Sequence, residues 1–230
     1  DDREAFFGFL ADLKGRLPAG KTLSIAVPAR TRLVEDAHEY PRIAQIVDRM
    51  IVMAYDEHWS TSAPGPVASL PWVTRVVDYA KSAVAIDRIV MGLPLYGRAW
   101  QDKRLATALR FQNVQDLLAE RQSTIEYTSE LGPHFEYPED VVVTVFYDDL
   151  RSLMEKLRLY RGRDIAAVSF WRIGQGPPDL WSSIDAAGAG AVPAAGDGSA
   201  ASPAGNPPAT VSASIADTKP TTIPACPASN

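Results

Sequence analysis

The chain has 230 residues, a hydrophobic fraction of 46%, a formal net charge of -5 and one cysteine, Cys226. These totals supply a packed core, exclude an internal disulfide framework and give no Lys/Arg cluster that would indicate a nucleic-acid surface. No run of about 18 apolar residues predicts a membrane span. The three histidines, His38, His58 and His134, are not paired at ligand spacing, so neither a zinc site nor a cofactor is expected.

Helical and extended patterns alternate over residues 1–185, which predicts an α/β fold with a parallel sheet. Helices are predicted over 1–17, 40–47, 71–81, 114–121, 149–160 and 178–184, and strands over 23–28, 50–55, 88–95, 141–147 and 164–171.

The first helix shows an apolar stripe, which the sequence predicts to consist of Phe6, Phe9, Leu10, Leu13 and Leu17. Residues 101–140 are the least regular part, and a short insertion with a small hairpin is predicted there, before the last strand, as one wall of a cleft. Residues 186–230 are rich in Ala, Gly, Ser, Pro and Thr and lack aromatic residues, so a disordered tail is predicted.

Three predicted strands end in aromatic and charged side chains. Because sites in α/β proteins lie at the carboxyl ends of parallel strands, these ends are candidates for one active site. Packing of the rings around a solvated loop is the alternative explanation. The side chains are Tyr55, Asp56, Glu57, His58 and Trp59 after the second strand, Tyr96, Arg98 and Trp100 after the third, and Trp171 at the last.

The segments Met53-Ala-Tyr-Asp56, Gly92-Leu-Pro-Leu-Tyr-Gly-Arg98 and Val168-Ser-Phe-Trp171, in this order, resemble the last strands of glycoside hydrolase family 18. Met-Ala-Tyr-Asp-x-His-Trp, from residue 53, is most similar to the bacterial cell-wall branch. Val145-Phe-Tyr-Asp-Asp149, followed by Ser152 and Lys156, also resembles the family. The resemblance implies that residues 1–185 form the second half, about four strand–helix units, of a TIM (β/α)8 barrel.

The family's signature on its fourth strand, Asp-x-x-Asp-x-Asp-x-Glu, does not occur in this sequence. Its last Glu is the general acid in the family, and Glu4, inside the first helix, is not a credible replacement. The chain is therefore expected to start downstream of the catalytic acid and, as given, to hydrolyse nothing.

The resemblance implies retaining hydrolysis of β-1,4-linked N-acetylglucosamine glycans, namely chitin, chito-oligosaccharide or peptidoglycan. The 2-acetamido group of the substrate would assist by attacking the anomeric carbon. In the catalytic site, Tyr55 is expected to hydrogen-bond the acetamido oxygen, and Asp56 to bond sugar hydroxyls or the acidic cluster of the signature. The expected substrate-binding residues are Met53, His58, Trp59, Tyr96, Arg98, Trp100 and Trp171.

The expected partner is a polysaccharide that contains N-acetylglucosamine, bound by a monomer without nucleic acid, and this substrate class implies a secreted or cell-envelope protein. Two other classes stay open. A chitinase-like lectin would keep the aromatic cleft without the acid, and the residues upstream of Asp1 would separate it from an enzyme. An unrelated four-stranded interaction domain is the other, although no Gly-rich strand-to-helix turn supports it.

Overall fold

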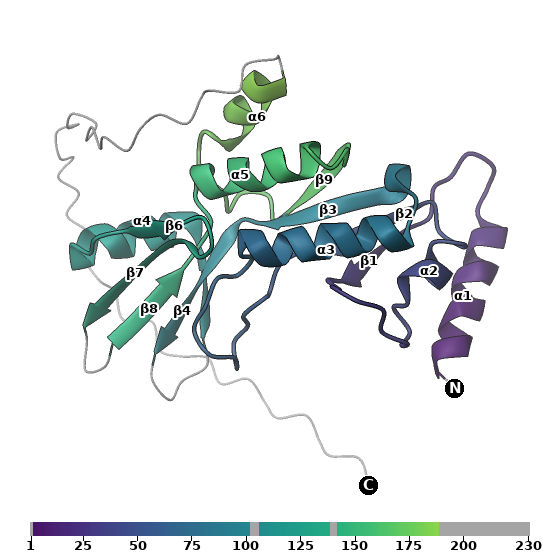
Figure 1. Ribbon diagram of the computed structural model, residues 1–230, viewed down its shortest axis with the longest axis horizontal. Coiled ribbons are helices and arrows are strands. Elements are labelled where there is room, and N and C mark those ends of the chain that lie inside the picture. Colours follow the sequence, from purple (N-terminus) through teal and green to yellow (C-terminus); the bar gives the residue numbers. More distant parts are fainter. Residues whose placement is uncertain (1, 102–105, 139–141, 189–230) are drawn as a thin grey trace, which may run out of the picture. The chain divides into compact units, whose positions relative to one another are not determined.

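The computed structural model describes residues 2–101, 106–138 and 142–188. The elements follow one another as shown in Figure 1. The part built on the parallel sheet comprises α1 (Asp2–Arg16), β1 (Ser24–Pro28), α2 (Tyr40–Ile43), β2 (Arg49–Met53), α3 (Leu70–Ala83), the 3-10 helix η1 (Ile86–Arg88), β3 (Ile89–Pro94), α5 (Leu150–Arg161), β9 (Ala167–Trp171) and α6 (Leu180–Gly188).

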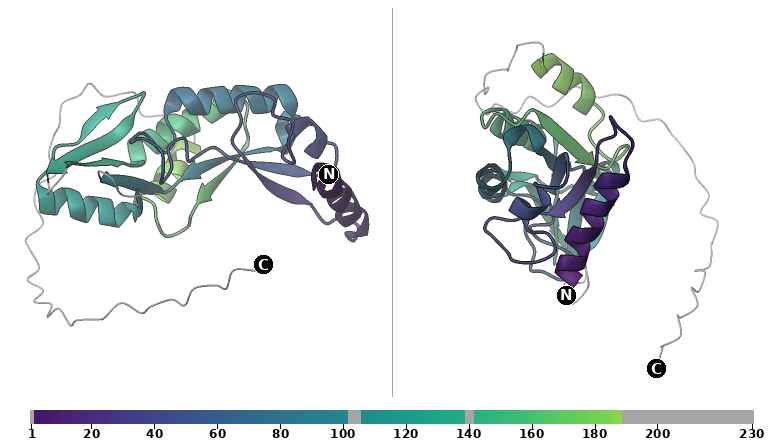
Figure 2. Two further views of the ribbon diagram at one scale, coloured as in Figure 1. Left: turned by 90° about the horizontal axis from the view of Figure 1, so that it is seen from below. Right: turned by 90° about the vertical axis from the view of Figure 1, so that its right-hand side faces the viewer.

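The four strands of this sheet are all parallel, in the order β1-β2-β3-β9, as the alternating sequence pattern predicts. The register places Val27, Val52, Met91 and Val168 in one row across the sheet. The first three of these side chains are fully buried, because α3 and α5 pack on this face. Figure 2 shows α3 running along one side of the strands.

The second face of the sheet carries smaller side chains and is partly open to solvent. Its register row consists of Ala26, Ile51, Val90 and Ala167, and of these only Val90 is buried. Parallel sheets are usually covered on both faces. Within the described residues this sheet is therefore fully covered on its α3 and α5 side alone.

Residues 96–146 form a second, antiparallel sheet in the strand order β5-β4-β8-β7-β6. It has a core of its own, built around Val114, Phe135 and Val145. The predicted small hairpin is present as β6 and β7, which pair antiparallel, but it belongs to a larger sheet of five strands. The strand predicted over 141–147 belongs to this sheet as well. The elements are β4 (Tyr96–Gln101), β5 (Thr107–Arg110), α4 (Phe111–Arg121), β6 (Glu126–Thr128), β7 (Gly132–Pro138) and β8 (Val142–Phe146).

The first helix, α1, buries a different stripe from the predicted one. Phe7 and Leu10 are its buried residues, whereas Phe9 is 58% exposed. Ion pairs also connect the helix to other segments, and they join Arg3 to Glu39, Glu4 to Arg42 and Lys14 to Asp48. None of the described helices is long and apolar enough to cross a membrane. Most of the predicted tail, from residue 189 onward, lies outside the described residues.

A buried ion pair joins the end of β8 to α5. The side chains of Asp148 and Lys156 are 3% and 5% exposed and form a salt bridge, and Ser152 Oγ donates a hydrogen bond of 2.7 Å to Asp148 Oδ1. Ser152 also completes the capping box of α5 with Asp149, whose side chain accepts from Ser152 N at 2.8 Å. A buried charge is tolerated when it is paired and hydrogen-bonded. The start of α5 is therefore fixed to β8 by charge as well as by packing.

Replacing Lys156 with Met should lower the free energy of unfolding by about 3–5 kcal/mol, because Asp148 stays buried without its counter-charge. Urea unfolding followed by tryptophan fluorescence measures the change. Lys21→Met, at an exposed lysine, is the control, with an expected change of at most about 0.5 kcal/mol. Adding Asp148→Asn to Lys156→Met should recover part of the loss. Equal stability of the Lys156 and Lys21 variants would contradict this account of the ion pair.

Candidate active site

An open groove of about 350 Å³ brings together side chains from the carboxyl ends of β2 and β9 and from β4 and β5. It is lined by Tyr55, Asp56, Tyr96, Arg98, Ala108, Leu109, Arg110, Trp171, Arg172 and Gln175. Five of the nine residues predicted for the site thus meet in one place, although they are up to 116 positions apart in the sequence.

Asp56 connects the end of β2 to β4. Tyr96 Oη donates a hydrogen bond of 2.6 Å and Arg98 Nη2 one of 2.7 Å, and both go to Asp56 Oδ1. Asp56 adopts a left-handed backbone conformation with φ of 61°, which aspartate tolerates better than most residues. Since neither contact uses Oδ2, and the side chain is 43% exposed, this second oxygen is available to a ligand hydroxyl.

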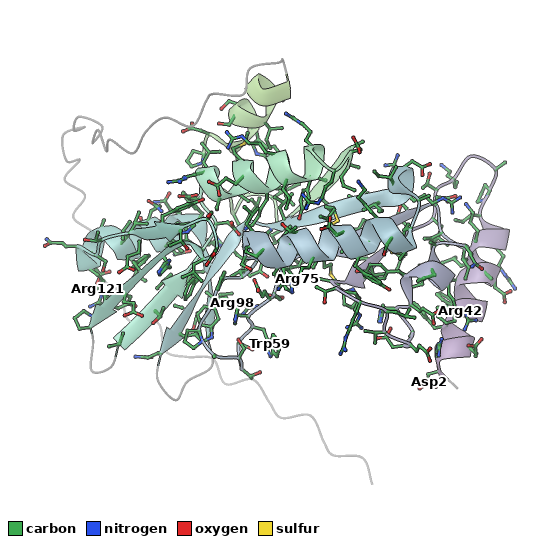
Figure 3. The ribbon with its side chains drawn as sticks, in the orientation of Figure 1. Asp2, Arg42, Trp59, Arg75, Arg98 and Arg121 are labelled. Atoms are coloured by element: carbon green, nitrogen blue, oxygen red, sulfur yellow. The ribbon has the colours of Figure 1, made fainter. Side chains whose placement is uncertain are left out.

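Burial, and then the hydrogen bond to Asp56, raise the pKa of Tyr96 far above the usual range of a phenol. Its hydroxyl is therefore a permanent donor to the Asp56 carboxylate. Arg98 supplies a positive charge on the same side, and its side chain is only 14% exposed. These two donors hold the Asp56 carboxylate at the groove (Figure 3 labels Arg98).

Tyr55 is half-buried, and its ring packs edge-on against Tyr96, with 6.3 Å between the ring centroids. Burial, with a smaller effect of the Asp56 charge, raises the pKa of the Tyr55 phenol, so its hydroxyl is a hydrogen-bond donor at neutral pH. Among the described residues, no group is hydrogen-bonded to this hydroxyl. A polar ligand in the groove can therefore receive its hydrogen bond.

The Tyr55 ring lies against the backbone of β3 at Gly92. A Cβ atom at position 92 would stand 3.0 Å from Tyr55 Cε1 and 2.9 Å from the carbonyl oxygen of Val52. Since real Cβ atoms rarely come so close to other heavy atoms, a larger residue there has to displace the ring or the neighbouring strand. Glycine at this position thus makes room for Tyr55 beside the groove.

Trp171 ends β9 and is 57% exposed, opposite Pro94 in the register of the sheet. Its carbonyl oxygen accepts a hydrogen bond of 2.7 Å from Leu95 N, which holds the backbone in place. The indole is therefore a flat apolar surface on a fixed support. Met53, the last residue of β2, is half-buried and does not line the groove.

The other predicted site residues lie away from the groove. Trp100 is only 5% exposed. Its ring packs edge-on against Phe146, and its indole N–H donates a hydrogen bond of 3.2 Å to Ser62 O. This corrects the prediction that its ring lines a subsite, because the loop after β2 covers it. His58 also has a structural contact, from Nδ1 to Pro66 O at 2.8 Å. Trp59, labelled in Figure 3, is 51% exposed on the same loop but does not line the groove.

Two arginines of the groove, Arg110 and Arg172, were missed by the sequence reasoning. Arg172 directly follows Trp171, so its place at the end of a predicted strand was a usable signal. Arg110 gave no such signal, because it reaches the groove only through the pairing of β5 with β4, where it stands opposite Tyr96.

Parallel strands that end in an aromatic groove with fixed polar groups define an α/β protein whose site suits a sugar. The sequence model of glycosyl hydrolases family 18 matches residues 1–176, and the chain therefore belongs to this family. The resemblance read from the motifs is thereby confirmed.

Relatives and solved structures agree with this membership. The cortical fragment-lytic enzyme of Bacillus anthracis is 31% identical over 195 residues, which cover 79% of this chain and 45% of that protein. The spore cortex-lytic enzyme SleL of Bacillus cereus superposes with a TM-score of 0.73 at 32% identity, again over 79% and 45% of the two chains. A chitinase from Chromobacterium violaceum gives 0.72 at 27% identity, over 80% of this chain and 61% of that one. The chain thus spans less than half the length of the first two.

Gly92→Ala should destabilise the protein by about 1–3 kcal/mol, as overpacking does, because the Tyr55 ring or the neighbouring strand has to move. Thermal unfolding measures the effect. Gly8→Ala is the control, since a Cβ at that position of α1 meets no atom within 4 Å. A Gly92→Ala protein that is at least as stable as the Gly8→Ala protein would show that Tyr55 does not need this space.

Proposed function

We propose that the protein hydrolyses β-1,4-linked N-acetylglucosamine glycans with retention of configuration, assisted by the 2-acetamido group of the substrate. The observation that carries the proposal is the meeting of the Tyr55 hydroxyl, the Asp56 carboxylate and the Trp171 indole in one groove. Family membership supports the reaction class, because family 18 is one in which the substrate assists. The names of two similar proteins, a cortical fragment-lytic enzyme and a chitinase, support the substrate class.

In this proposal Tyr55 positions the nucleophile. Its hydroxyl donates a hydrogen bond to the acetamido carbonyl oxygen and keeps that oxygen close to the anomeric carbon. The oxygen attacks this carbon as the glycosidic bond breaks, the leaving oxygen takes a proton from the general acid, and a cyclic oxazolinium ion forms. Water then attacks the anomeric carbon and opens this ion, which gives the product with retained configuration. Asp56 accepts a hydrogen bond from the sugar through Oδ2, because Oδ1 is already occupied by Tyr96 and Arg98. Fixed donors and acceptors of this kind lower a barrier chiefly by positioning.

Trp171 has a different task. Its exposed indole stacks on the apolar face of the pyranose at the cleaved bond, and this contact is present before and during the reaction. Such a contact supports ground state and transition state alike. Met53, at the end of β2, is proposed to stand beside the acetamido methyl group, below the groove.

The general acid is proposed to be a carboxyl group outside these 230 residues. Among the described residues that line the groove, Asp56 is the one carboxylate, and it is already held by Tyr96 and Arg98. In the same proposal, the parallel sheet is the second half of a (β/α)8 barrel, and its partly open face belongs to the barrel interior. A secreted or cell-envelope location follows from the substrate.

A chitinase-like lectin is the alternative, and the comparisons with known proteins do not favour it. The two candidates differ in one property, because a lectin binds the glycan without releasing products. The experiment uses the intact protein, which here means this chain together with the part proposed to carry the general acid position. Its incubation with chitotetraose, followed by mass spectrometry, distinguishes the two candidates. Product release identifies the enzyme, and stable binding alone identifies the lectin.

In the intact protein, Tyr55→Phe should lower kcat about 100-fold and change KM much less, because the lost hydrogen bond acts on the nucleophile. Trp171→Ala should lower kcat/KM through weaker binding as well as slower turnover. Initial rates on a soluble chito-oligosaccharide measure both.

Two variants outside the groove serve as controls. Tyr79→Phe removes a hydroxyl on α3, and Trp181→Ala removes a half-exposed indole on α6. Neither should change the rates more than about twofold. A Tyr55→Phe enzyme with the kcat of the Tyr79→Phe enzyme would refute the role of Tyr55.

A further inference from the structure

The groove is positively charged although the chain as a whole is acidic. Three arginines line it, Arg98, Arg110 and Arg172, against the single carboxylate of Asp56. Since Arg98 and Asp56 neutralise each other, the charges of Arg110 and Arg172 remain. The formal net charge of the chain is -5, so this excess runs against its average composition.

The two remaining arginines stand on neighbouring parts of the groove wall. Arg110 ends β5 and pairs with Tyr96 of β4, and residues paired across an antiparallel sheet project from the same face. Arg172 follows Trp171 at the end of β9. A hydrogen bond of 3.2 Å from Phe111 N to Gln175 O joins the segment after Arg110 to the turn after Arg172.

Both side chains are exposed, and within the described residues neither forms an ion pair. Arginine presents its donors as a planar fork that matches a carboxylate. Two such forks without a protein carboxylate, in a groove that already has a sugar-stacking surface, are suited to a negatively charged group on the sugar chain.

We propose that Arg110 and Arg172 form a carboxylate-binding subsite, which makes the protein selective for N-acetylglucosamine glycans that carry an acidic group beside the cleaved bond. The inference rests on the proposed function and deepens it. Tyr55, Asp56 and Trp171 hold the sugar whose acetamido group reacts, and the two arginines hold the carboxylate of the adjoining part of the glycan. Neutral chitin lacks this group, so it is the poorer ligand.

The test compares two tetrasaccharides that differ only in the charge of their two lactyl groups. One alternates N-acetylglucosamine with N-acetylmuramic acid, which carries an ether-linked carboxylate, and the other has the same carboxylates converted to amides. The Kd of the intact protein for each is measured within minutes of mixing, with hydrolysis followed on the same samples. We expect about tenfold tighter binding of the acidic form at low ionic strength, and a smaller preference at high salt, as for partly exposed charged contacts.

Arg110→Gln combined with Arg172→Gln should reduce this ratio of affinities to about 1. Arg75→Gln, an equal loss of charge on the exposed side of α3, should leave the ratio unchanged. The ratio is the readout because it is independent of any general loss of glycan binding. A preference that survives the double substitution, or that Arg75→Gln abolishes equally, overturns the assignment.

A third tetrasaccharide, with peptides attached through its lactyl groups, locates the carboxylate. Tighter binding of the peptide-free acid than of its amide supports the sugar-borne acid, whereas a preference seen only with the peptide-bearing form overturns that source. Equal binding of acid and amide overturns the inference and leaves the proposed function intact. If the intact protein binds none of the three, both are overturned.

Discussion

The site depends on the contact between Asp56 and its two donors on β4, Tyr96 and Arg98. Asp56 follows a strand of the parallel sheet, and its donors belong to the antiparallel sheet, so the contact fixes one wall of the groove to the other. The left-handed backbone of Asp56 aims its carboxylate at both donors. Without this charge-assisted contact, the Tyr55 ring, which packs on Tyr96, would lose its support as well.

The parallel sheet places the remaining groups through its register. Gly92 makes room for Tyr55 on the neighbouring strand, and Trp171 stands opposite Pro94, two positions beyond Gly92. The strands on either side of β3, β2 and β9, thus deliver a hydroxyl and an indole to the same edge of the sheet. The insertion adds what the parallel sheet lacks, since β4 and β5 contribute Arg98 and Arg110. The residues proposed to act on the acetamido group of the substrate therefore follow strands of the parallel sheet, whereas the carboxylate-binding subsite takes Arg110 from the antiparallel sheet and Arg172 from the end of β9.

Much of the parallel part was predictable, because Met50–Met53 and Ile89–Met91 are apolar runs that suit strands covered by helices. The motifs at the ends of the predicted parallel strands also placed Tyr55, Asp56 and Trp171 in one candidate site. The second sheet was not predictable in this way, since the pairing of β4 with β8 joins segments far apart in the sequence and the edge strand β5 is short. The prediction that Trp100 lines the groove failed for a similar reason, because its burial depends on a contact with the distant loop at Ser62. In α1, Phe7 is buried in place of the predicted Phe9, because the contacts that bury one face of this helix are made with other segments of the chain.

A crystal structure of the intact protein with N-acetylglucosamine-thiazoline, a stable analogue of the oxazolinium ion, tests the central claim most directly. The account predicts that the heteroatoms derived from the acetamido group lie within hydrogen-bond distance of the Tyr55 hydroxyl. It also predicts that the pyranose ring stacks on the Trp171 indole and that a sugar hydroxyl donates to Asp56 Oδ2. An analogue bound elsewhere, or bound in the groove with the acetamido-derived ring turned away from Tyr55, would contradict it.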